Sequence, residues 1–257
     1  MKLATWNVNG LRARLDYVLL WLRERQPDVV GLQELKMTDD LFPHDLFEAE
    51  GYRAEVYGQK AWNGVAVLSR HDINTSQRGL PGQDEFGSRL ITTEVEGISF
   101  TTVYCPNGKS VEHDDYPRKL DWFDALASYM GGLRNAEQPT VICGDFNICP
   151  SSLDTWDEAG HADRIFHTSA ERSRMQALYD LELTDTFRTL HPDSTAFSWW
   201  DYRAGSFQRN HGLRIDFILA NPPAAARVES VEIDRDFRKK KEGLTASDHA
   251  PVIATLA

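Results

Sequence analysis

The stretch Val141-Ile142-Cys143-Gly144-Asp145-Phe146-Asn147 runs from three apolar residues directly into an aspartate and an asparagine. A short apolar run that ends at a glycine is typical of a buried strand. A carboxylate at the end of such a strand costs free energy unless it pairs or binds something. The same pattern recurs at five other strand ends, within residues 3–10, 29–36, 102–108, 214–219 and 245–249. The sequence therefore predicts that polar groups from distant segments meet in one cluster.

Around these ends, β-rich apolar stretches recur along the whole chain, and helical periodicity appears in three places. Strands are expected at 3–8, 29–32, 52–57, 65–68, 90–95, 98–104, 140–143, 215–220, 228–233 and 252–256. Helices are expected at 11–22, 120–130 and 170–179. Grouped strands with interspersed helices predict an α/β fold of two packed sheets with helices outside. Because no repeat, linker or change in composition marks a boundary, we expect residues 1–257 to form a single domain.

The composition narrows the class of protein. A chain of 257 residues buries a sufficient core without disulfides, and its three cysteines form no Cys-x-x-Cys pair, which suits a reducing cytosol. The longest apolar run, 17–22, is too short to span a membrane, and residues 1–7 lack the apolar centre of a secretory signal. We therefore expect a cytoplasmic monomer without a membrane partner. The net charge of −11 argues against binding nucleic acid through bulk charge.

Taken singly, each polar residue at a strand end is explained as a turn residue or a cap. Taken together, they suit metal-assisted hydrolysis of a phosphoester. Glu34 with Asp248 or Asn7 offers a few hard oxygen ligands, which suit Mg²⁺ that also binds a phosphate. His249 with Asp216 makes a histidine–carboxylate pair, in which the acid stabilises the imidazolium.

The remaining strand ends supply a base and phosphate donors. Asp145 is a candidate general base for water, and Asn147 stands beside it as a polar stabiliser. Tyr104 and Asn107 are able to donate to phosphate oxygens. No glycine-rich phosphate loop, Gly-x-Ser-x-Gly elbow or His-Glu-x-x-His helix competes with this interpretation.

Six motifs follow one another in an order that resembles the exonuclease III family of abasic-site endonucleases, within the endonuclease/exonuclease/phosphatase superfamily. They are 6–13 (WNVNGLRA), 33–36 (QELK), 104–108 (YCPNG), 144–147 (GDFN), 213–216 (LRID) and 247–251 (SDHAP). The resemblance covers essentially the whole chain. It implies a four-layer αββα sandwich, with the site at one edge of the sheets.

The resemblance also implies an activity. It implies a Mg²⁺-dependent DNA repair nuclease, with Mn²⁺ as a possible substitute, that acts in base excision repair. The enzyme would cut duplex DNA 5′ to an abasic site, leaving a 3′-hydroxyl and a 5′-deoxyribose phosphate. It would also act as a 3′–5′ exonuclease and as a phosphodiesterase that clears blocked 3′ ends.

Within that family pattern, the resemblance gives each polar residue a role. Glu34 is the principal metal ligand, with Asn7 and Asp248 nearby. Either Asp145 or Tyr104 takes the proton, and the sequence does not decide between them. Asn147 supports Asp145, and His249, held by Asp216, contacts the scissile phosphate. These last roles complete the implied catalytic set.

The resemblance implies an apolar pocket for an extruded sugar, lined by Trp199, Leu213 and Ile215. Trp200 fits the pocket or the core equally well, and Leu213 replaces a tryptophan of the animal enzymes, so the balance between abasic incision and 3′ trimming stays open. The residues expected to hold DNA are Asn9, Arg12, Lys36, Asn107 and Arg203. The basic run 238–241, next to the 247–251 motif, is a further candidate for gripping a strand.

Two other classes of protein fit the sequence less well. A nonspecific deoxyribonuclease of the secreted type generally carries histidine in place of Tyr104 and needs disulfides, and phosphatases of inositol phosphates or lipids lack the motifs at 9–13 and 104–107. A non-catalytic binding module would be free to lose its acids, yet every expected polar residue is present. Because basic residues flank the acidic motifs, we expect DNA contact through one limited face, with strong salt dependence.

Overall fold

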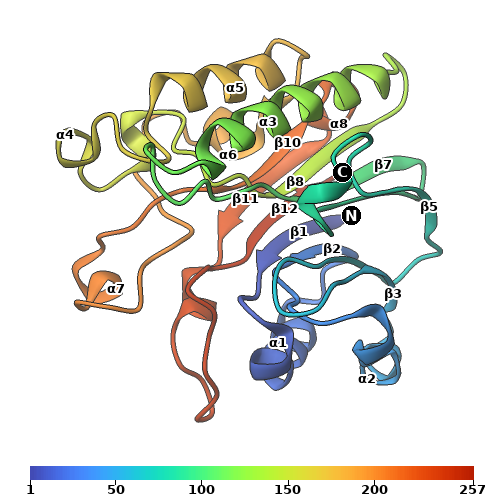
Figure 1. The fold of residues 1–257 in the computed structure, drawn as a ribbon. Helices are drawn as coiled ribbons and strands as arrows, with labels where there is room; N and C mark the ends of the chain where they lie inside the picture. Colours follow the sequence, from blue (N-terminus) through green and yellow to red (C-terminus); the bar gives the residue numbers. More distant parts are fainter.

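The computed structural model describes all residues, 1–257, as two six-stranded mixed sheets packed face to face (Figure 1). Sheet A has the order β11-β12-β1-β2-β4-β3, and sheet B has the order β5-β6-β7-β8-β10-β9. The strands of sheet A are β1 Lys2–Asn7, β2 Val29–Gln33, β3 Arg53–Tyr57, β4 Val65–Ser69, β11 Val228–Ile233 and β12 Val252–Leu256. The strands of sheet B are β5 Asn74–Arg78, β6 Leu90–Val95, β7 Ile98–Tyr104, β8 Thr140–Asp145, β9 Thr184–Asp185 and β10 Asp216–Ala220.

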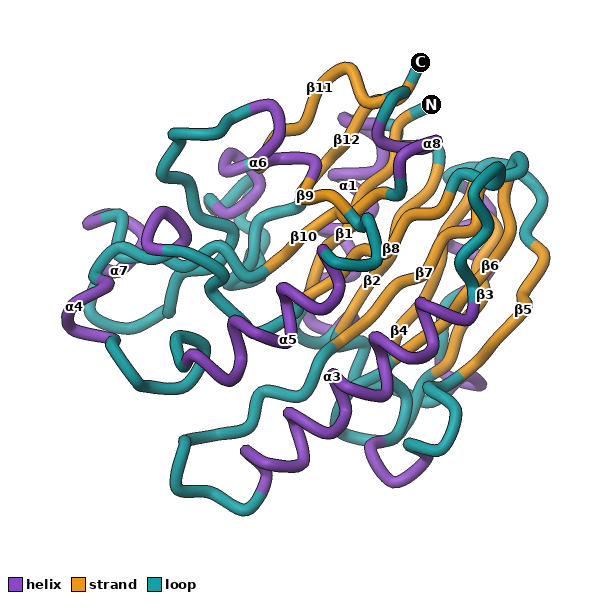
Figure 2. The backbone as a smooth tube through the Cα atoms, turned by 90° about the horizontal axis from the view of Figure 1, so that it is seen from above, coloured by secondary structure: helices purple, strands orange, loops and turns teal.

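The longer helices form the two outer layers. Helix α1 (Leu11–Arg25) packs on the outer face of sheet A, with α2 (His44–Ala49) beside it. Helices α3 (Asp115–Gly132) and α5 (Ser169–Tyr179) lie across the outer face of sheet B (Figure 2). The short helices are α4 Glu158–His161, α6 Thr186–Leu190, α7 Ser206–Arg209 and α8 Pro222–Ala225, and none of the helices has the length and apolarity needed to cross a membrane. The four-layer αββα sandwich is thus confirmed.

Three apolar cores hold these layers together. One lies between α1 and sheet A, one lies between sheet B and helices α3 and α5, and one fills the space between the two sheets. The inner core joins residues such as Val67 of sheet A to Phe100 and Cys143 of sheet B. Both faces of the central strands are therefore buried, which explains why β2, β4 and β8 read as continuous apolar runs rather than as alternating ones.

All ten expected strands and all three expected helices are present with some shifted ends, whereas the short helices α2, α4, α6, α7 and α8 were not expected. Helix α3 begins at Asp115, before its apolar stripe. Strand β8 extends to Asp145, because the aspartate still pairs with its neighbours in the sheet. Two strands have no counterpart among the expected ones. Strand β5 (Asn74–Arg78) is a polar, half-exposed edge strand, and β9 has only two residues, so neither carries an apolar pattern.

The strand directions determine where the polar strand ends meet. Strands β1 and β2 are parallel, as are β7 and β8, so four carboxyl ends lie at one end of the sandwich. Strands β10 and β12 run antiparallel to β8 and β1, so their amino ends lie there too. The six polar segments singled out from the sequence therefore converge at one end of the molecule, as predicted.

Candidate active site

Three site residues lie side by side on neighbouring strands of sheet B. Asp145, at the end of β8, is paired in register with Tyr104 of β7 on one side and with Asp216 of β10 on the other. Gly144 allows this close approach, because a Cβ atom there would lie 1.9 Å from the carbonyl oxygen of Val103. The sheet itself, rather than a loop, thus fixes the spacing of these three side chains.

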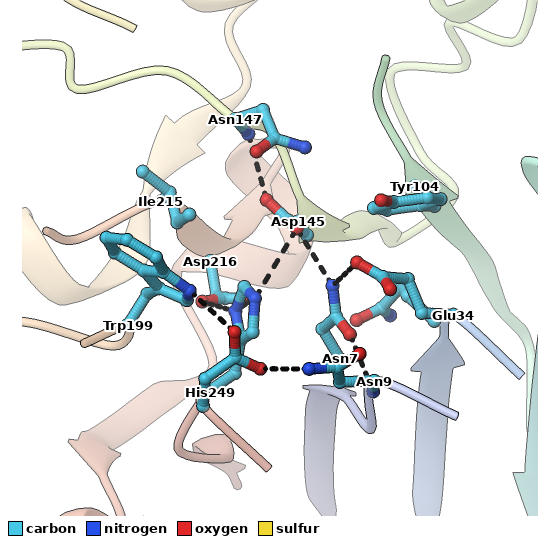
Figure 3. A network of polar contacts seen from close by, with 12 residues as sticks. Asn7, Asn9, Glu34, Tyr104, Asp145, Asn147, Trp199, Ile215, Asp216 and His249 are labelled. Atoms are coloured by element: carbon cyan, nitrogen blue, oxygen red, sulfur yellow. Dashed lines mark hydrogen bonds and ion pairs between the residues drawn. The ribbon is translucent and has the colours of Figure 1, made fainter. Parts of the chain in front are cut away.

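His249 precedes β12 and points its ring at these carboxylates (Figure 3). Its Nδ1 lies 2.8 Å from Asp216 Oδ2, and its Nε2 lies 3.8 Å from Asp145 Oδ2. The Ser198 hydroxyl donates to the same Asp216 oxygen at 2.6 Å and so fixes that carboxylate. Burial alone lowers the pKa of His249, but Asp216 and the other nearby acids outweigh burial and raise it to about 10. The imidazole is therefore held protonated at neutral pH.

Asp145 has the opposite character to an ordinary surface aspartate. Burial is the main cause that raises its pKa to about 7, the charges of Asp216 and Glu34 add to this, and His249 opposes it. Its Oδ2 accepts a hydrogen bond from Asn7 Nδ2 at 2.9 Å, and its Oδ1 accepts one from the Asn147 amide at 2.9 Å. This carboxylate is therefore poised to gain or lose a proton close to neutral pH.

Residues of sheet A form the side of the site that faces Asp145 and Asp216 of sheet B. The side-chain amide of Asn7, at the end of β1, donates both to Asp145 and to Glu34 Oε1, at 2.9 Å each (Figure 3). Lys36 Nζ lies 2.9 Å from Glu34 Oε2 and 2.7 Å from Asn9 Oδ1. Burial raises the pKa of Glu34, but the bond from Asn7 and the charge of Lys36 outweigh it, so the net shift is downward. Glu34 is thus held ionised.

Asp248 joins the same side of the site through Asn9 and Trp199. Asn9 Nδ2 donates to Asp248 Oδ1 at 2.9 Å, and Trp199 Nε1 donates to Oδ2 at 3.0 Å. Burial raises the pKa of Asp248, but the charge of His249 and these two bonds lower it further than burial raises it. Asn9 and Glu34 both adopt left-handed backbone conformations, with φ of +47° and +54°, which turn their side chains back over the strand ends.

The donor set of this end fits a hard divalent cation. The four carboxylates Glu34, Asp145, Asp216 and Asp248 outnumber the three nearby cations Lys36, Arg89 and His249, so the cluster carries a small excess of negative charge. Asp145, Asp216 and His249 each place a ligand atom within 4.8 Å of the others. The Asp216 side chain is 0% exposed and is held by Ser198 and His249, whereas the Glu34 side chain is 15% exposed, so Glu34 is the more accessible ligand for a cation of this kind.

A third side of the site is formed by Tyr104 and Asn107. A cavity of about 670 Å³ adjoins both residues. Arg89, whose guanidinium carbon lies 4.9 Å from the Tyr104 ring centroid, and the 70% exposed Trp62 line this cavity, and neither was singled out from the sequence. Burial and the charge of Glu34 raise the pKa of Tyr104 well above its usual range. Arg89 carries little signal in the sequence, because it lies next to β6 without a polar motif.

The residues expected to form an apolar pocket do come together. Leu213 and Ile215 pack with Cys149, and Trp199 and Phe166 close over them. The backbones of Trp199 and Leu213 pair by hydrogen bonds of 2.9 Å in both directions. Trp200, by contrast, is fully buried in a separate core with Phe197 and Ala250 and takes no part in this pocket.

The basic residues divide into those near the cluster and those away from it. Lys36 is part of the site, and Arg12 is exposed on the first turn of α1. Arg203 has an 87% exposed side chain that pairs with Asp201 at 2.6 Å, so the structure does not bring it into the cluster. In the run 238–241, Arg238 is buried and donates to the carbonyl oxygens of Asp248 and Trp200, which makes it an internal brace.

Comparisons with known proteins agree with this geometry. The model of the endonuclease/exonuclease/phosphatase family matches residues 4–249. Exodeoxyribonuclease III of Haemophilus influenzae is 37% identical over 267 aligned residues, which cover 99% of each chain. The structure of the 3′ phosphatase NExo from Neisseria bound to a product DNA hairpin is 38% identical, with a TM-score of 0.94 and coverage of 100% of this chain and 99% of that one. An AP endonuclease from Archaeoglobus fulgidus is 32% identical, with a TM-score of 0.95 and the same coverage.

A fold of this kind with an acidic, histidine-containing end defines a metal-dependent phosphoesterase. The chain belongs to the endonuclease/exonuclease/phosphatase family. Within that family it is a DNA repair nuclease similar to exodeoxyribonuclease III, as its motifs predicted.

Proposed function

We propose that this nuclease hydrolyses phosphodiester bonds of duplex DNA at damaged sites in base excision repair. It would cut 5′ to abasic sites, leaving a 3′-hydroxyl and a 5′-deoxyribose phosphate, and would trim and unblock 3′ ends. One observation carries the proposal: a carboxylate with a pKa of about 7 stands next to an imidazolium that a second carboxylate keeps protonated. These are a base for water and a donor for phosphate oxygen, in one cleft.

The roles follow from the charge states. Asp145, ionised at neutral pH in a large fraction of molecules, would take the proton from the attacking water. His249 would donate a hydrogen bond to the scissile phosphate, and Asp216 would keep its tautomer and charge. The pKa of Tyr104 lies far above neutrality, so this hydroxyl stays protonated and would donate to phosphate rather than act as the base. Asn107 and Asn147 would add neutral donors to the phosphate.

The proposed cofactor is Mg²⁺, with Mn²⁺ as a substitute. Glu34 would be the principal ligand, because its carboxylate is held ionised at the mouth of the cluster, and Asn7 and Asp248 would assist. Such an ion, when bound, neutralises charge that develops on the phosphate. The excess of carboxylates over cations supports this assignment.

Two kinds of substrate are proposed for this site, abasic sites and blocked 3′ ends. The apolar cluster of Trp199, Leu213 and Ile215 would offer an apolar surface to an extruded sugar without a base, and a structural relative is named an AP endonuclease. The relative named a 3′ phosphatase, bound to product DNA, supports action on 3′ ends. We propose that both activities reside in this one site and that Asn9, Arg12 and Lys36 hold the DNA backbone. Because Arg203 pairs with Asp201 outside the cluster, its contribution is expected to be small.

We further propose that residues 1–257 act as one domain and as a cytoplasmic monomer. The three cysteines are free and buried, which is compatible with a reducing compartment. Binding to DNA would depend strongly on salt, because the contact is limited to one face of an acidic protein.

The test compares two duplexes, one with a single tetrahydrofuran abasic analogue and one with a nick that carries a 3′-phosphate. Each is incubated with the protein in Mg²⁺, in Mn²⁺ or in EDTA. We expect cleavage of both substrates in either metal and none in EDTA. The exposed Asp193→Asn serves as a control that should behave like the wild type. Activity that persists in EDTA would contradict the proposed dependence on a metal. Cleavage of the 3′-phosphate nick without cleavage of the abasic duplex would restrict the function to 3′ ends.

A further inference from the structure

Lys119 on α3 and Glu171 on α5 form an ion pair that is completely buried behind the active site. The Nζ–Oε1 distance is 2.5 Å, and both side chains are 0% exposed. A charged pair so far from water is costly to bury, and apolar residues of similar size would often stabilise a fold equally well. Its presence therefore calls for a reason other than stability.

The ammonium group of Lys119 reaches two loops of the active site. Besides Glu171, it donates to the carbonyl oxygen of Asn147 at 2.8 Å and to that of Asn107 at 3.2 Å. All three N–H groups of the ammonium are thus satisfied, and two of them hold the backbone of Asn107 and Asn147, the residues proposed above as donors to the phosphate. Asn107 follows β7 and Asn147 follows β8, so one cation ties together the ends of two neighbouring strands.

The loop that Lys119 holds has an unusual backbone conformation at Asn147. Asn147 adopts a left-handed backbone, with φ of +51°, and its amide donates to Asp145 Oδ1 at 2.9 Å. Its side-chain amide donates to the Cys105 carbonyl at 3.0 Å, and its Oδ1 lies 3.4 Å from Asn107 Nδ2. A shift of this backbone would move the donor to Asp145 and the Asn107–Asn147 contact together.

Glu171 extends the same network to the apolar pocket. Its carboxylate accepts hydrogen bonds from the Phe166 amide at 3.0 Å and from the Thr168 hydroxyl at 2.9 Å. Phe166 in turn packs against the apolar cluster of Cys149, Leu213 and Ile215, and its carbonyl oxygen accepts a bond from the Cys149 amide at 2.8 Å. The ion pair therefore connects the phosphate side of the site with the pocket side.

We propose that Lys119 and Glu171 are positioning residues for the nuclease reaction, which hold Asn107 and Asn147 in the geometry that binds the phosphate in the transition state. The inference rests on the proposed function of these two asparagines. A positioning role differs from a merely structural one in a measurable way. Removal of the pair should reduce the chemical step in a protein that is still folded, and it should do so only where Asn147 is present.

The experiment uses the double variant Lys119→Met/Glu171→Leu, which keeps the buried volume but removes both charges. As a control, Arg174→Met removes an ion pair with Asp124 that joins the same two helices at the surface, 3.0 Å long. Single-turnover rates on the 3′-phosphate nick, KM and urea unfolding midpoints are measured for each. We expect kcat of the double variant to fall 10- to 100-fold with KM changed less than threefold. The control should retain full kcat.

A cycle with Asn147→Ala separates the two roles. In the Asn147→Ala background, the double substitution should lower kcat by less than threefold further, because the group that it positions is already gone. Full kcat in the folded double variant, or the same fall in both backgrounds, would overturn the proposal. If the double variant is unfolded at 25 °C, Glu171→Gln takes its place with a threefold or larger fall expected, and unchanged kcat there overturns it too. Full activity of Asn147→Ala itself would instead refute the proposed function of that residue.

Discussion

Two buried polar clusters of this protein both pair aspartates with a cationic side chain, and they behave in opposite ways. The active-site cluster consists of Asn7, Glu34, Lys36, Asp145, Asp216, Asp248 and His249. The arginine cluster consists of Asp154, Asp185, Arg188 and Arg214, with Arg214 bonded to Asp154 at 2.7 Å and to Asp185 at 2.8 Å. Asp145 of the active-site cluster and Asp154 of the arginine cluster are each 1% exposed.

The difference lies in charge balance rather than in burial. Burial raises the pKa of Asp154, but the charges of Arg214 and Arg188 outweigh burial, so its net shift is downward. For Asp145 burial wins, because the nearby acids add to it, and the pKa rises to about 7. A compensated carboxylate stabilises the fold, whereas an uncompensated one is ready to exchange a proton or to hold a cation. Asp216 and Arg214, two positions apart, belong to different clusters.

The first prediction concerns the uncompensated acid. Asp145→Asn should lower kcat by about 10³-fold or more, because removal of a general base typically costs 10²–10⁴-fold. The unfolding midpoint should stay the same or rise, since the charge that is removed is unfavourable in the folded state. Rates on the nicked and abasic duplexes and urea denaturation at pH 8 measure both effects. If Asp145→Asn lost stability but kept its rate, Asp145 would serve the fold rather than catalysis, and the prediction would be wrong.

The second prediction is the reverse case. Asp154→Asn should destabilise the fold by about 3–5 kcal/mol, because it leaves Arg214 buried with one partner fewer. The kcat of the fraction that remains folded should change less than fivefold. Since the pKa of Asp154 is lowered on folding, its stabilising contribution is present above the unfolded pKa and is lost as the pH falls through the folded value. Urea midpoints of the wild type and the variant are compared at pH 8 and at pH 3, below the usual pKa of an aspartate. The variant should have the lower midpoint at pH 8 and a smaller deficit at pH 3, and equal midpoints of the two proteins at pH 8 would contradict the prediction.

The sequence predicted the first cluster much better than the second. Asp145, Asp216 and His249 stand at the ends of apolar strands, where a polar residue is conspicuous, and strand direction alone brings such ends together. Arg214 also adjoins a strand, but its partner Asp154 lies 60 positions away on a short 3-10 turn without a periodic pattern. Pairing at that distance is a property of the fold, not of a local motif.

The same reasoning explains the other differences. Lys119 directly precedes the apolar stripe expected at 120–130 and looks like a surface residue, and only the packing of α5 on α3 buries it with Glu171. The run 238–241 looks like a DNA-binding stretch, yet Arg238 turns inward and Lys241 pairs with Asp236. The composition of these segments correctly predicted their charge. It does not predict whether a side chain points into the protein or toward solvent, because that depends on the tertiary fold.

A third prediction concerns the cation that the excess of carboxylates invites. Mg²⁺ at about 100 times its Kd should stabilise the wild type by about 2.7 kcal/mol, because a ligand that binds only the folded state shifts the unfolding equilibrium by mass action. Glu34→Gln should abolish most of this stabilisation, whereas Asp154→Asn should retain it. Thermal unfolding in Mg²⁺ and in EDTA measures the difference. Equal stabilisation of the Glu34→Gln variant would place the ion elsewhere.

The smallest and most discriminating effect is the pH dependence of the rate. Asp145 must be ionised and His249 protonated, so kcat/KM at saturating Mg²⁺ should rise up to tenfold per pH unit below about 7 and fall above about 10. Asp216→Asn removes the main charge that raises the pKa of His249, and burial then lowers it, so the upper limb should move down by more than one pH unit. Since the two groups interact, the limbs describe the pair, and the comparison between variants is the decisive measurement. An upper limb that stays in place in Asp216→Asn would mean that this carboxylate only positions the ring, which would make the active-site cluster more like the arginine cluster than its charge balance implies.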